Sequence, residues 1–284
     1  MPSISIAYFS QTGTTQTIAE HIARGLGKTG VKPTLSPMTE MAPHRFAEAD
    51  ILGLGLPVYM FRPPFLVMDF LKALPDLTGK SFFLFVLFGT HPGSTASTVR
   101  QILLQKGATE LGLHYSMGAD LFAGYLKEGT LFSPDRPSQA DKEASESFGE
   151  SLLARFHNGQ PLPEVDLFGA GIPDLIERAF THRFLARHLY RHTIVVQDEL
   201  CSSCGLCANL CPTGNITMEE GKPRIGKECL LCLTCQLRCP KGAFWSPFTS
   251  WVFAPVMKFN IWNGKRRGVE HVPVTWEGGK VKRI

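Results

Sequence analysis

The chain has 284 residues, of which 44% are hydrophobic and 19% charged, and its formal net charge is +4. This length accommodates two domains. The first residues, MPSISIAYFS, lack a basic region followed by a long apolar run, and the apolar run 81–88 is too short to cross a bilayer. We therefore expect a cytoplasmic protein without a signal peptide and without a membrane partner.

The N-terminal segment predicts a strand at residues 4–9 that leads into a turn rich in hydroxyl groups. A helix follows, with apolar residues at positions 18, 19, 22, 23 and 26. Backbone N–H groups and the helix dipole make such a turn an anion site. We assign a phosphate group to this turn, whose residues are Ser10, Gln11, Thr12, Gly13, Thr14 and Thr15. The alternative is that Thr12 or Thr14 only caps the helix.

This turn resembles the phosphate loop of flavodoxins, T/S-x-T-G-x-T, because Ser10, Thr12, Gly13 and Thr15 match it in position. The resemblance implies bound FMN. Further strands are predicted at 31–35, 49–56, 81–88 and 113–121. Helices are predicted at 64–74, 94–106 and 138–157. Apolar strands that alternate with helices indicate an α/β fold. We expect a flavodoxin-like doubly wound parallel five-stranded sheet over residues 1–158.

Two further loops should contact the flavin, because ligands of such sheets bind beyond the carboxyl ends of the strands at the switch point. The resemblance implies an aromatic residue against the flavin ring, and our candidates are Tyr59 and then Phe61. The loop after the third strand contains Pro57, Val58, Tyr59, Met60 and Phe61. The loop after the fourth strand, whose amides would meet the pyrimidine edge, contains Phe88, Gly89, Thr90, His91 and Gly93. The alternative is that these are ordinary core and loop residues.

The stretch 25–30 spells G-x-G-x-x-G but ends a helix, so it predicts no dinucleotide site. Residues 159–194 are expected to be a linker and a bridging helix. The helix, predicted at 174–192, has apolar residues on one face and arginines on the other. A basic amphipathic helix can lie on a membrane, but a helix that bridges two domains needs the same apolar stripe. We favour the bridge.

All eight cysteines lie between residues 201 and 239, in two copies of C-x2-C-x2-C-x3-C-P offset by 28 residues. Three closely spaced thiolates of such a run bind one 4Fe-4S cluster, and the fourth binds the other cluster. Cluster I is assigned to Cys201, Cys204, Cys207 and Cys239. Cluster II is assigned to Cys211, Cys229, Cys232 and Cys235. The alternatives are two zinc sites, which usually use paired cysteines, or disulfides, which need an oxidising compartment.

Residues 195–245 resemble bacterial-type two-cluster ferredoxins, which implies a small α+β domain, and residues 216–225 predict a hairpin. The usual glycine after the second cysteine is Gly205 in the first run, but Leu233 replaces it in the second. The resemblance therefore fixes the geometry of the first loop better than that of the second.

Residues 246–284 predict an aromatic segment that covers the cofactor domain, followed by a solvated basic tail. Residues 161–284 contain 16 Lys and Arg against 11 Asp and Glu. Because eight thiolates on two clusters would add negative charge, this basic excess is a counter-charge. It does not indicate a nucleic-acid partner.

The whole chain resembles flavodoxin–ferredoxin fusion proteins of anaerobic bacteria and archaea. The resemblance implies transfer of low-potential electrons between FMN, two 4Fe-4S clusters and a redox partner protein or enzyme, with no catalytic acid or base. A homodimer is compatible with this role. Two other hypotheses stay open: a flavin-dependent reductase of a small acceptor, and a flavin-free docking domain fused to a ferredoxin.

Overall fold

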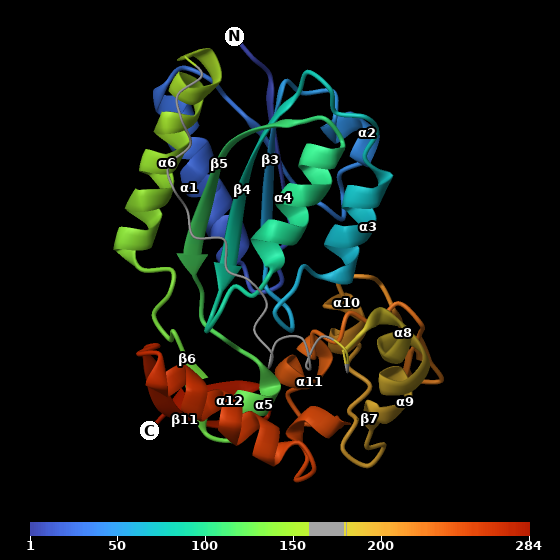
Figure 1. Ribbon diagram of the computed structural model, residues 1–284. Helices are drawn as coiled ribbons and strands as arrows, with labels where there is room; N and C mark the ends of the chain where they lie inside the picture. The colour runs from blue at the N-terminus through green and yellow to red at the C-terminus, as the bar shows by residue number, and fades with distance from the viewer. Residues whose placement is uncertain (159–178, 180) are drawn as a thin grey trace. The chain divides into compact units, whose positions relative to one another are not determined.

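The computed structural model describes residues 1–158, 179 and 181–284 (Figure 1). Contacts divide the chain into two compact units. The first unit comprises Met1–Gly118 and Asp135–Ala179, and the second comprises Ala119–Pro134 and Phe180–Ile284. The chain therefore passes from one unit to the other more than once.

The first unit is built on a five-stranded sheet with the order β2-β1-β3-β4-β5. Its strands are β1 (Ile4–Tyr8), β2 (Thr34–Pro37), β3 (Ile51–Pro57), β4 (Ser81–Phe88) and β5 (Thr109–Met117). All neighbouring strands are parallel. The order reverses at β1, so the loops that leave β1 and β3 diverge at a switch point. The predicted doubly wound α/β fold is confirmed.

Helices cover both faces of this sheet (Figure 1). The helices are α1 (Thr14–Lys28), α2 (Pro43–Phe46), α3 (Phe65–Ala73), α4 (Thr95–Gln105) and α6 (Gln139–Asn158). Helices α1 and α6 lie side by side, and glycines allow their close approach. A Cβ atom at Gly25 would lie 2.0 Å from the Glu146 carbonyl oxygen, and one at Gly149 would lie 2.3 Å from the Ile22 carbonyl oxygen. The first glycine of the G-x-G-x-x-G stretch thus serves helix packing.

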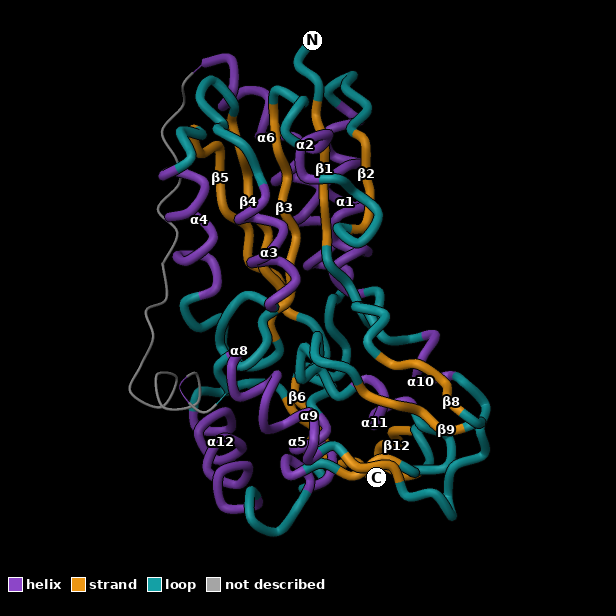
Figure 2. Tube along the Cα trace, turned by 90° about the vertical axis from the view of Figure 1, so that its right-hand side faces the viewer, coloured by secondary structure: helices purple, strands orange, loops and turns teal. Residues whose placement is uncertain are grey.

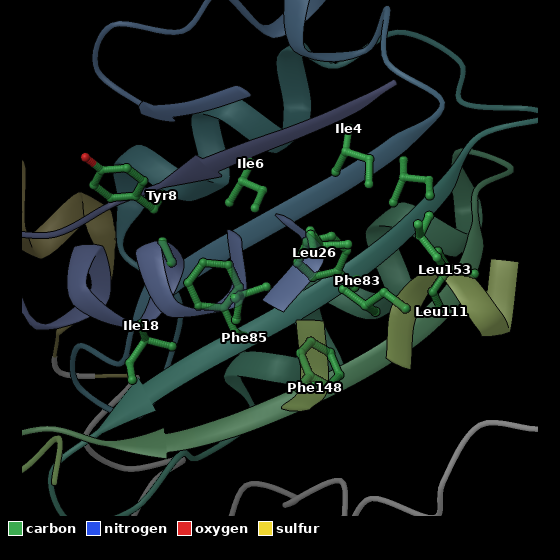
Figure 3. Close-up of a cluster of buried hydrophobic side chains, with 14 of the residues drawn as sticks. Ile4, Ile6, Tyr8, Ile18, Leu26, Phe83, Phe85, Leu111, Phe148 and Leu153 are labelled. Atoms are coloured by element: carbon green, nitrogen blue, oxygen red, sulfur yellow. The ribbon is translucent and has the colours of Figure 1, made fainter. Parts of the chain in front are cut away.

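The core between α1, α6 and the sheet consists of apolar side chains that recur at helical and strand spacing (Figure 3). On α1, Ile18, Ile22 and Leu26 recur every fourth residue, so they lie on one side of the helix. On β4, Phe83 and Phe85 are two residues apart, so they lie on the same face of the sheet. All five side chains are fully buried. Each buried side chain of this size stabilises the fold by roughly 1.5–3 kcal/mol. This core holds the carboxyl ends of the strands in place.

The second unit contains the cysteine region and a small sheet. Its elements before the C-terminal part are α8 (Arg183–Leu185), the π-helical η1 (Ala186–Tyr190), α9 (Arg191–Thr193), β7 (Val195–Val196), α10 (Leu206–Asn209), β8 (Ile216–Glu219), β9 (Lys222–Ile225), α11 (Thr234–Arg238), β10 (Phe244–Trp245) and η2 (Pro247–Thr249). Strands β8 and β9 form the predicted hairpin (Figure 2). The expected linker and the start of the expected bridging helix lie outside the described residues, whereas residues 183–193 are helical.

One expectation about chain organisation differs from the structure. The expected N-terminal domain 1–158 is interrupted, because residues 119–134 belong to the second unit. They form α5 (Ala123–Lys127) and β6 (Thr130–Phe132). Strand β6 pairs antiparallel with β11 (His271–Glu277), so this segment is held by the C-terminal part of the chain.

The end of the expected aromatic segment and the expected basic tail have a regular backbone. They form α12 (Ala254–Arg266), β11 and β12 (Lys280–Arg283), and the strands join β6 in the order β12-β11-β6. The side chain of Val274 is buried against Leu126 and Leu131, which explains the order. The basic side chains of Lys280, Lys282 and Arg283 remain exposed.

Candidate cofactor sites

The predicted phosphate turn joins β1 to the N-terminus of α1. Gly13 adopts the left-handed conformation with φ of 85° and precedes the first helical residue. Gly13 is the N-cap residue, and among the described residues the contact recorded for the Thr12 and Thr14 hydroxyls is with each other and not with the helix backbone, which argues against the capping alternative. The Oγ1 atoms of these two threonines lie 3.2 Å apart. The first N–H groups of a 15-residue helix therefore face this turn without a side-chain acceptor.

Two observations show that the turn fits a phosphate group. The Ser10 Oγ atom is buried and has no hydrogen-bond partner among the described residues. A buried hydroxyl without a partner is unfavourable, and a phosphate oxygen would accept its hydrogen bond. A Cβ atom added at Gly13 would meet no atom within 4 Å, so there is open space above the turn.

The loop after β3 contains a strained turn. The backbone groups of Tyr59 and Arg62 exchange two hydrogen bonds, of 3.0 and 3.1 Å. Between them, Met60 and Phe61 both have positive φ angles, of 49° and 57°. Each such residue costs on the order of 1–3 kcal/mol, and strain of this kind concentrates at functional sites. The Tyr59 and Phe9 rings pack in a T-shaped arrangement with their centroids 6.1 Å apart, which places Tyr59 beside the end of β1.

The loop after β4 packs directly against this turn. The Ser94 N–H donates to the Phe61 carbonyl oxygen at 3.3 Å, and the rings of Phe61 and His91 lie 6.1 Å apart. A Cβ atom at Gly93 would lie 2.3 Å from that same oxygen, so only glycine fits. The Gly93 N–H donates to His91 Nδ1 at 3.0 Å. His91 therefore has a structural role as an acceptor within the loop.

Sequence reasoning missed two polar atoms at the same edge of the sheet. Thr95 Oγ1, at the start of α4, and Ser116 Oγ, near the end of β5, are both buried without a hydrogen-bond partner among the described residues. The hydroxyl-rich stretch at 94–95, at the start of a helix that follows a strand, was the available signal for the first. Nothing in the local pattern around Ser116 signals a site.

The cysteines of the second unit gather around two cavities. One cavity is lined by Cys201, Cys204, Cys207 and Cys239. The other is lined by Cys211, Cys229, Cys232 and Cys235. Each cavity thus receives three cysteines from one run and the fourth from the other run. Each predicted ligand set thus lines one cavity. Among the described residues, no group of three or more His, Cys, Asp or Glu side chains is arranged to hold a single metal ion, so each set of four cysteines fits a larger group such as an iron–sulfur cluster. All eight cysteines are free of disulfide bonds.

The backbones of the two loops repeat each other at the same offset of 28 residues. The φ angles are 56° at Ser203 and 57° at Leu231, and 72° at Gly205 and 54° at Leu233. Leu233 therefore adopts the left-handed conformation that its glycine counterpart adopts, at a cost of about 1–2 kcal/mol. The second loop has the geometry of the first despite the replacement.

Hydrogen bonds to sulfur also repeat. The Asn215 N–H donates to Cys211 Sγ at 3.3 Å, and the Ala243 N–H donates to Cys239 Sγ at 3.3 Å. These bonds orient the fourth cysteine of each run toward the cavity of the other run. Hydrogen bonds to cluster sulfurs are also among the factors that tune the reduction potential.

Burial affects the pKa of thiols in both cavities, and in the first it raises the pKa of Cys207. Burial raises the pKa of Cys229 to about 12 and raises the pKa of Cys235 well above its usual value. In the first loop, hydrogen bonds from the Leu206 backbone and the Ser202 side chain lower the pKa of Cys204, which is exposed. Thiolates in the second cavity therefore need a nearby cation to form.

A hydrogen-bonded segment covers α11, which carries Cys235. The buried Gln236 side chain donates to the Phe244 carbonyl oxygen at 3.3 Å and to Thr249 Oγ1 at 2.9 Å. It also accepts a bond of 2.7 Å from the Ser246 hydroxyl. Residues 244–249 are thereby fixed over this helix, which agrees with a covering role for the aromatic segment.

Two family models match this chain. Residues 5–128 match the family model of the flavodoxin domain, and residues 194–217 match that of the 4Fe-4S binding domain. The electron transport protein HydN of Escherichia coli K12 is 36% identical over 64 residues, which cover 21% of this chain and 37% of HydN. The DNA-directed RNA polymerase subunit Rpo3 of Methanosarcina mazei is 38% identical over 58 residues, which cover 19% of this chain and 22% of Rpo3.

Similar solved structures include flavodoxins. Flavodoxin 2 from Bacillus cereus has a TM-score of 0.45 and 22% identity, and the match covers 54% of this chain and 99% of that one. The flavodoxin of Streptococcus pneumonia TIGR4 has a TM-score of 0.44 and 22% identity, with 54% and 98% covered. Among the described helices, none is long and apolar enough to cross a membrane. The chain thus carries a flavodoxin domain at its N-terminus and a 4Fe-4S binding domain toward its C-terminus, as its motifs predicted.

Proposed function

We propose that this chain is an electron-transfer protein that binds FMN in its first unit and two 4Fe-4S clusters in its second unit. It would relay low-potential electrons between these cofactors and a redox partner protein or enzyme. The observation that carries the proposal is the crossed arrangement of the cysteines around two cavities. Zinc sites do not explain three cysteines from one run combined with the fourth from the other.

The support for a second cluster comes from the structure more than from the family match. The 4Fe-4S family model covers residues 194–217, which include only the first cysteine run. The second run supports a second cluster because its loop repeats the backbone of the first, including the left-handed residues. Its cavity also has the same complement of four cysteines.

The FMN proposal rests on the edge of the sheet where three loops meet. Ser10, Thr12 and the N-terminus of α1 would hold the phosphate group. The packed loops after β3 and β4 would hold the flavin ring, with Tyr59 against its face. Bound FMN accepts one or two electrons, whereas a 4Fe-4S cluster transfers one at a time. None of these residues needs to act as an acid or base, so relay of electrons is the chemistry that the arrangement supports.

The test is anaerobic purification followed by quantification of iron, sulfide and flavin, with electron paramagnetic resonance of the reduced protein. We expect about eight irons and one FMN per chain, and the spectrum of two interacting 4Fe-4S clusters. Bound zinc in place of iron would reject the cluster proposal. Full iron content without flavin would instead identify the first unit as a docking domain.

Partner and assembly are part of the same proposal. We propose a redox protein as partner and no nucleic acid, because two clusters would offset the basic excess of the second half. A homodimer is compatible with the relay. The mass of the cofactor-loaded protein, measured by light scattering, distinguishes it from a monomer.

A further inference from the structure

Helix α12 carries apolar side chains on two opposite sides. Its inner side packs within the second unit, where Met257 and Ile261 are buried with Tyr125 and Phe132. Its outer side presents large apolar side chains at a spacing of three residues: Val256, Phe259 and Trp262 are 46%, 47% and 53% exposed. A helix of a globular protein normally has a polar outer side. The outer side of α12 therefore departs from the ordinary pattern.

The turn before α12 extends this apolar surface. Trp251 is 85% exposed and Val252 is 58% exposed. Contiguous exposed apolar side chains of this size mark a site of interaction. We call the surface formed by Trp251, Val252, Val256, Phe259 and Trp262 the outer face of α12.

Basic side chains border the outer face. Lys258 and Lys265 are seven residues apart, so they lie along the same line of the helix, and both are exposed. The Arg266 guanidinium lies over the Trp262 ring at 5.1 Å from its centroid. Lys258 has one acidic neighbour, Glu128, at 3.9 Å.

Basic residues outnumber acidic ones around α12, where Glu128 and Glu270 are the nearby carboxylates in contact or in sequence. No Asp or Glu occurs between residues 229 and 269, whereas six basic residues do: Arg238, Lys241, Lys258, Lys265, Arg266 and Arg267. The occupant of the outer face must therefore combine an apolar layer with negative charge. A second copy of this chain, which would bring two basic borders together around a two-fold axis, does not meet this requirement.

We propose that the outer face of α12 binds the headgroup region of an anionic lipid bilayer. Tryptophans at the boundary of an apolar surface, bordered by Lys and Arg, are typical of helices that lie in the membrane interface. Protein–protein interfaces are instead depleted in Lys. A helix of 13 residues lies in the interface and does not cross it.

This inference does not depend on the proposed electron transfer, because the outer face contains no cofactor residue. It does place the unit with the cysteine cavities at a membrane surface. The sequence expectation of no membrane partner considered spanning segments and the helix predicted at 174–192, and it treated the aromatic segment after residue 246 as cover for the cofactor domain. A partner reached there would itself be membrane-associated.

Co-sedimentation of the intact, anaerobically purified protein with vesicles tests the proposal. One set of vesicles contains phosphatidylcholine alone, and the other contains phosphatidylcholine with phosphatidylglycerol. We expect binding to the second set at low salt, weakened binding as salt rises, and little binding to the first set. Absence of binding to anionic vesicles at low salt overturns the proposal.

Matched variants locate the binding surface. Phe259→Ser should weaken vesicle binding about tenfold. Leu104→Ser, which removes a 40% exposed apolar side chain from α4, should not. The double variant Lys265→Gln/Arg267→Gln should lose on the order of tenfold or more, whereas Lys32→Gln/Lys72→Gln in the first unit should lose far less. Equal losses in the control variants would reject the outer face as the binding surface.

The variants also separate the other occupants. Unchanged iron and flavin contents verify that each variant folds. If Phe259→Ser converts a dimer to a monomer without changing vesicle binding, the face is an interface between copies and the proposal fails. Retention of the protein on immobilised polyglutamate, together with no vesicle binding, would assign the face to an acidic protein and overturn it as well.

Discussion

The two cysteine loops share one backbone but differ in their contact with solvent. In the first loop Cys204 is exposed, as are Leu206 and Leu210. In the second loop Leu231, Leu233 and Leu237 are buried. Spacing thus fixes which cysteines converge, whereas the residues between them decide how far each cavity is screened from water. Two sites with one ligand pattern can therefore have different stabilities and potentials.

The largest expected effect comes from removing one ligand in each loop. Cys204→Ser should eliminate the cluster of the first cavity, and Cys232→Ser that of the second, with iron falling by about four per chain in each case. Because the second loop is more buried, loss of its cluster should destabilise the protein more. Cys232→Ser should therefore lower the melting temperature more than Cys204→Ser does. Iron quantification, electron paramagnetic resonance and thermal unfolding measure these effects, with the exposed Thr217→Ala as a control. Two intact cluster signals in both variants would contradict the ligand assignment.

A substitution in the first unit should remove the flavin, so that the two cysteine loops can be compared without it. Thr12→Asp places a carboxylate beside the proposed phosphate, which should weaken FMN binding on the order of 100-fold. The conservative variant Thr12→Ser should keep most of the affinity. Flavin titration measures the FMN affinity of both variants. The iron content and the paramagnetic resonance signals of the two clusters should not change. If FMN affinity stays the same in Thr12→Asp, the phosphate is held elsewhere.

Residues 244–249, which cover α11, should stabilise the second cysteine loop and not the first. Gln236→Ala removes a buried side chain that makes three hydrogen bonds and leaves the Ser246 hydroxyl without its acceptor. We expect a loss of about 2–3 kcal/mol in unfolding free energy. Denaturant unfolding with intact clusters measures it. The exposed Thr217→Ala on β8 should change stability by less than about 0.5 kcal/mol. A similar loss in both variants would show that the cover has no special role.

A smaller effect should follow from exchanging the residue types at the left-handed positions. Gly205→Ala, where a Cβ atom would meet no atom within 4 Å, should cost about 1 kcal/mol through backbone strain alone. Leu233→Gly relieves strain but removes a buried side chain, so we expect a net loss of about 1 kcal/mol. Denaturant unfolding compares the two variants. A clear gain in stability for Leu233→Gly would mean that its side chain contributes little packing.

The smallest effect concerns the two reduction potentials. Adding an electron makes a cluster more negative, and burial disfavours charge, so the cluster of the second cavity should have the lower midpoint potential, by on the order of tens of millivolts. A redox titration followed by electron paramagnetic resonance assigns the two signals with the help of the cysteine variants. The reverse order would show that nearby charges and hydrogen bonds outweigh solvent exposure.

Local patterns predicted the sheet, the phosphate turn and the grouping of the cysteines, because each depends on residues close together in sequence. Segment 119–134 could not be assigned this way. Strand β6 has only three residues, and its partner Pro273–His271 lies about 140 residues away. Likewise, β11 contains a proline and β12 contains two lysines. From sequence alone, this part of the chain resembles a solvated tail, because its pairing with β6 is not visible there.

The sites show the same division. Ser10 was identified from its place in a motif, but its buried hydroxyl without a partner is visible only in three dimensions. Ser116 has no motif around it and was missed. Leu233 was read as a departure, whereas packing around its buried side chain holds the backbone where glycine would otherwise be needed.

The pairing of Phe132 with His271 has a consequence for synthesis of the protein. On a ribosome that adds roughly 5–20 residues per second, strand β6 emerges on the order of ten seconds before its partner exists. During that time its edge and the apolar side of α5 lack their final neighbours, as they would in any fragment that ends near residue 158. Chains that stop early should therefore aggregate, and the first unit is better prepared for separate study by replacing residues 119–134 with a short polar loop.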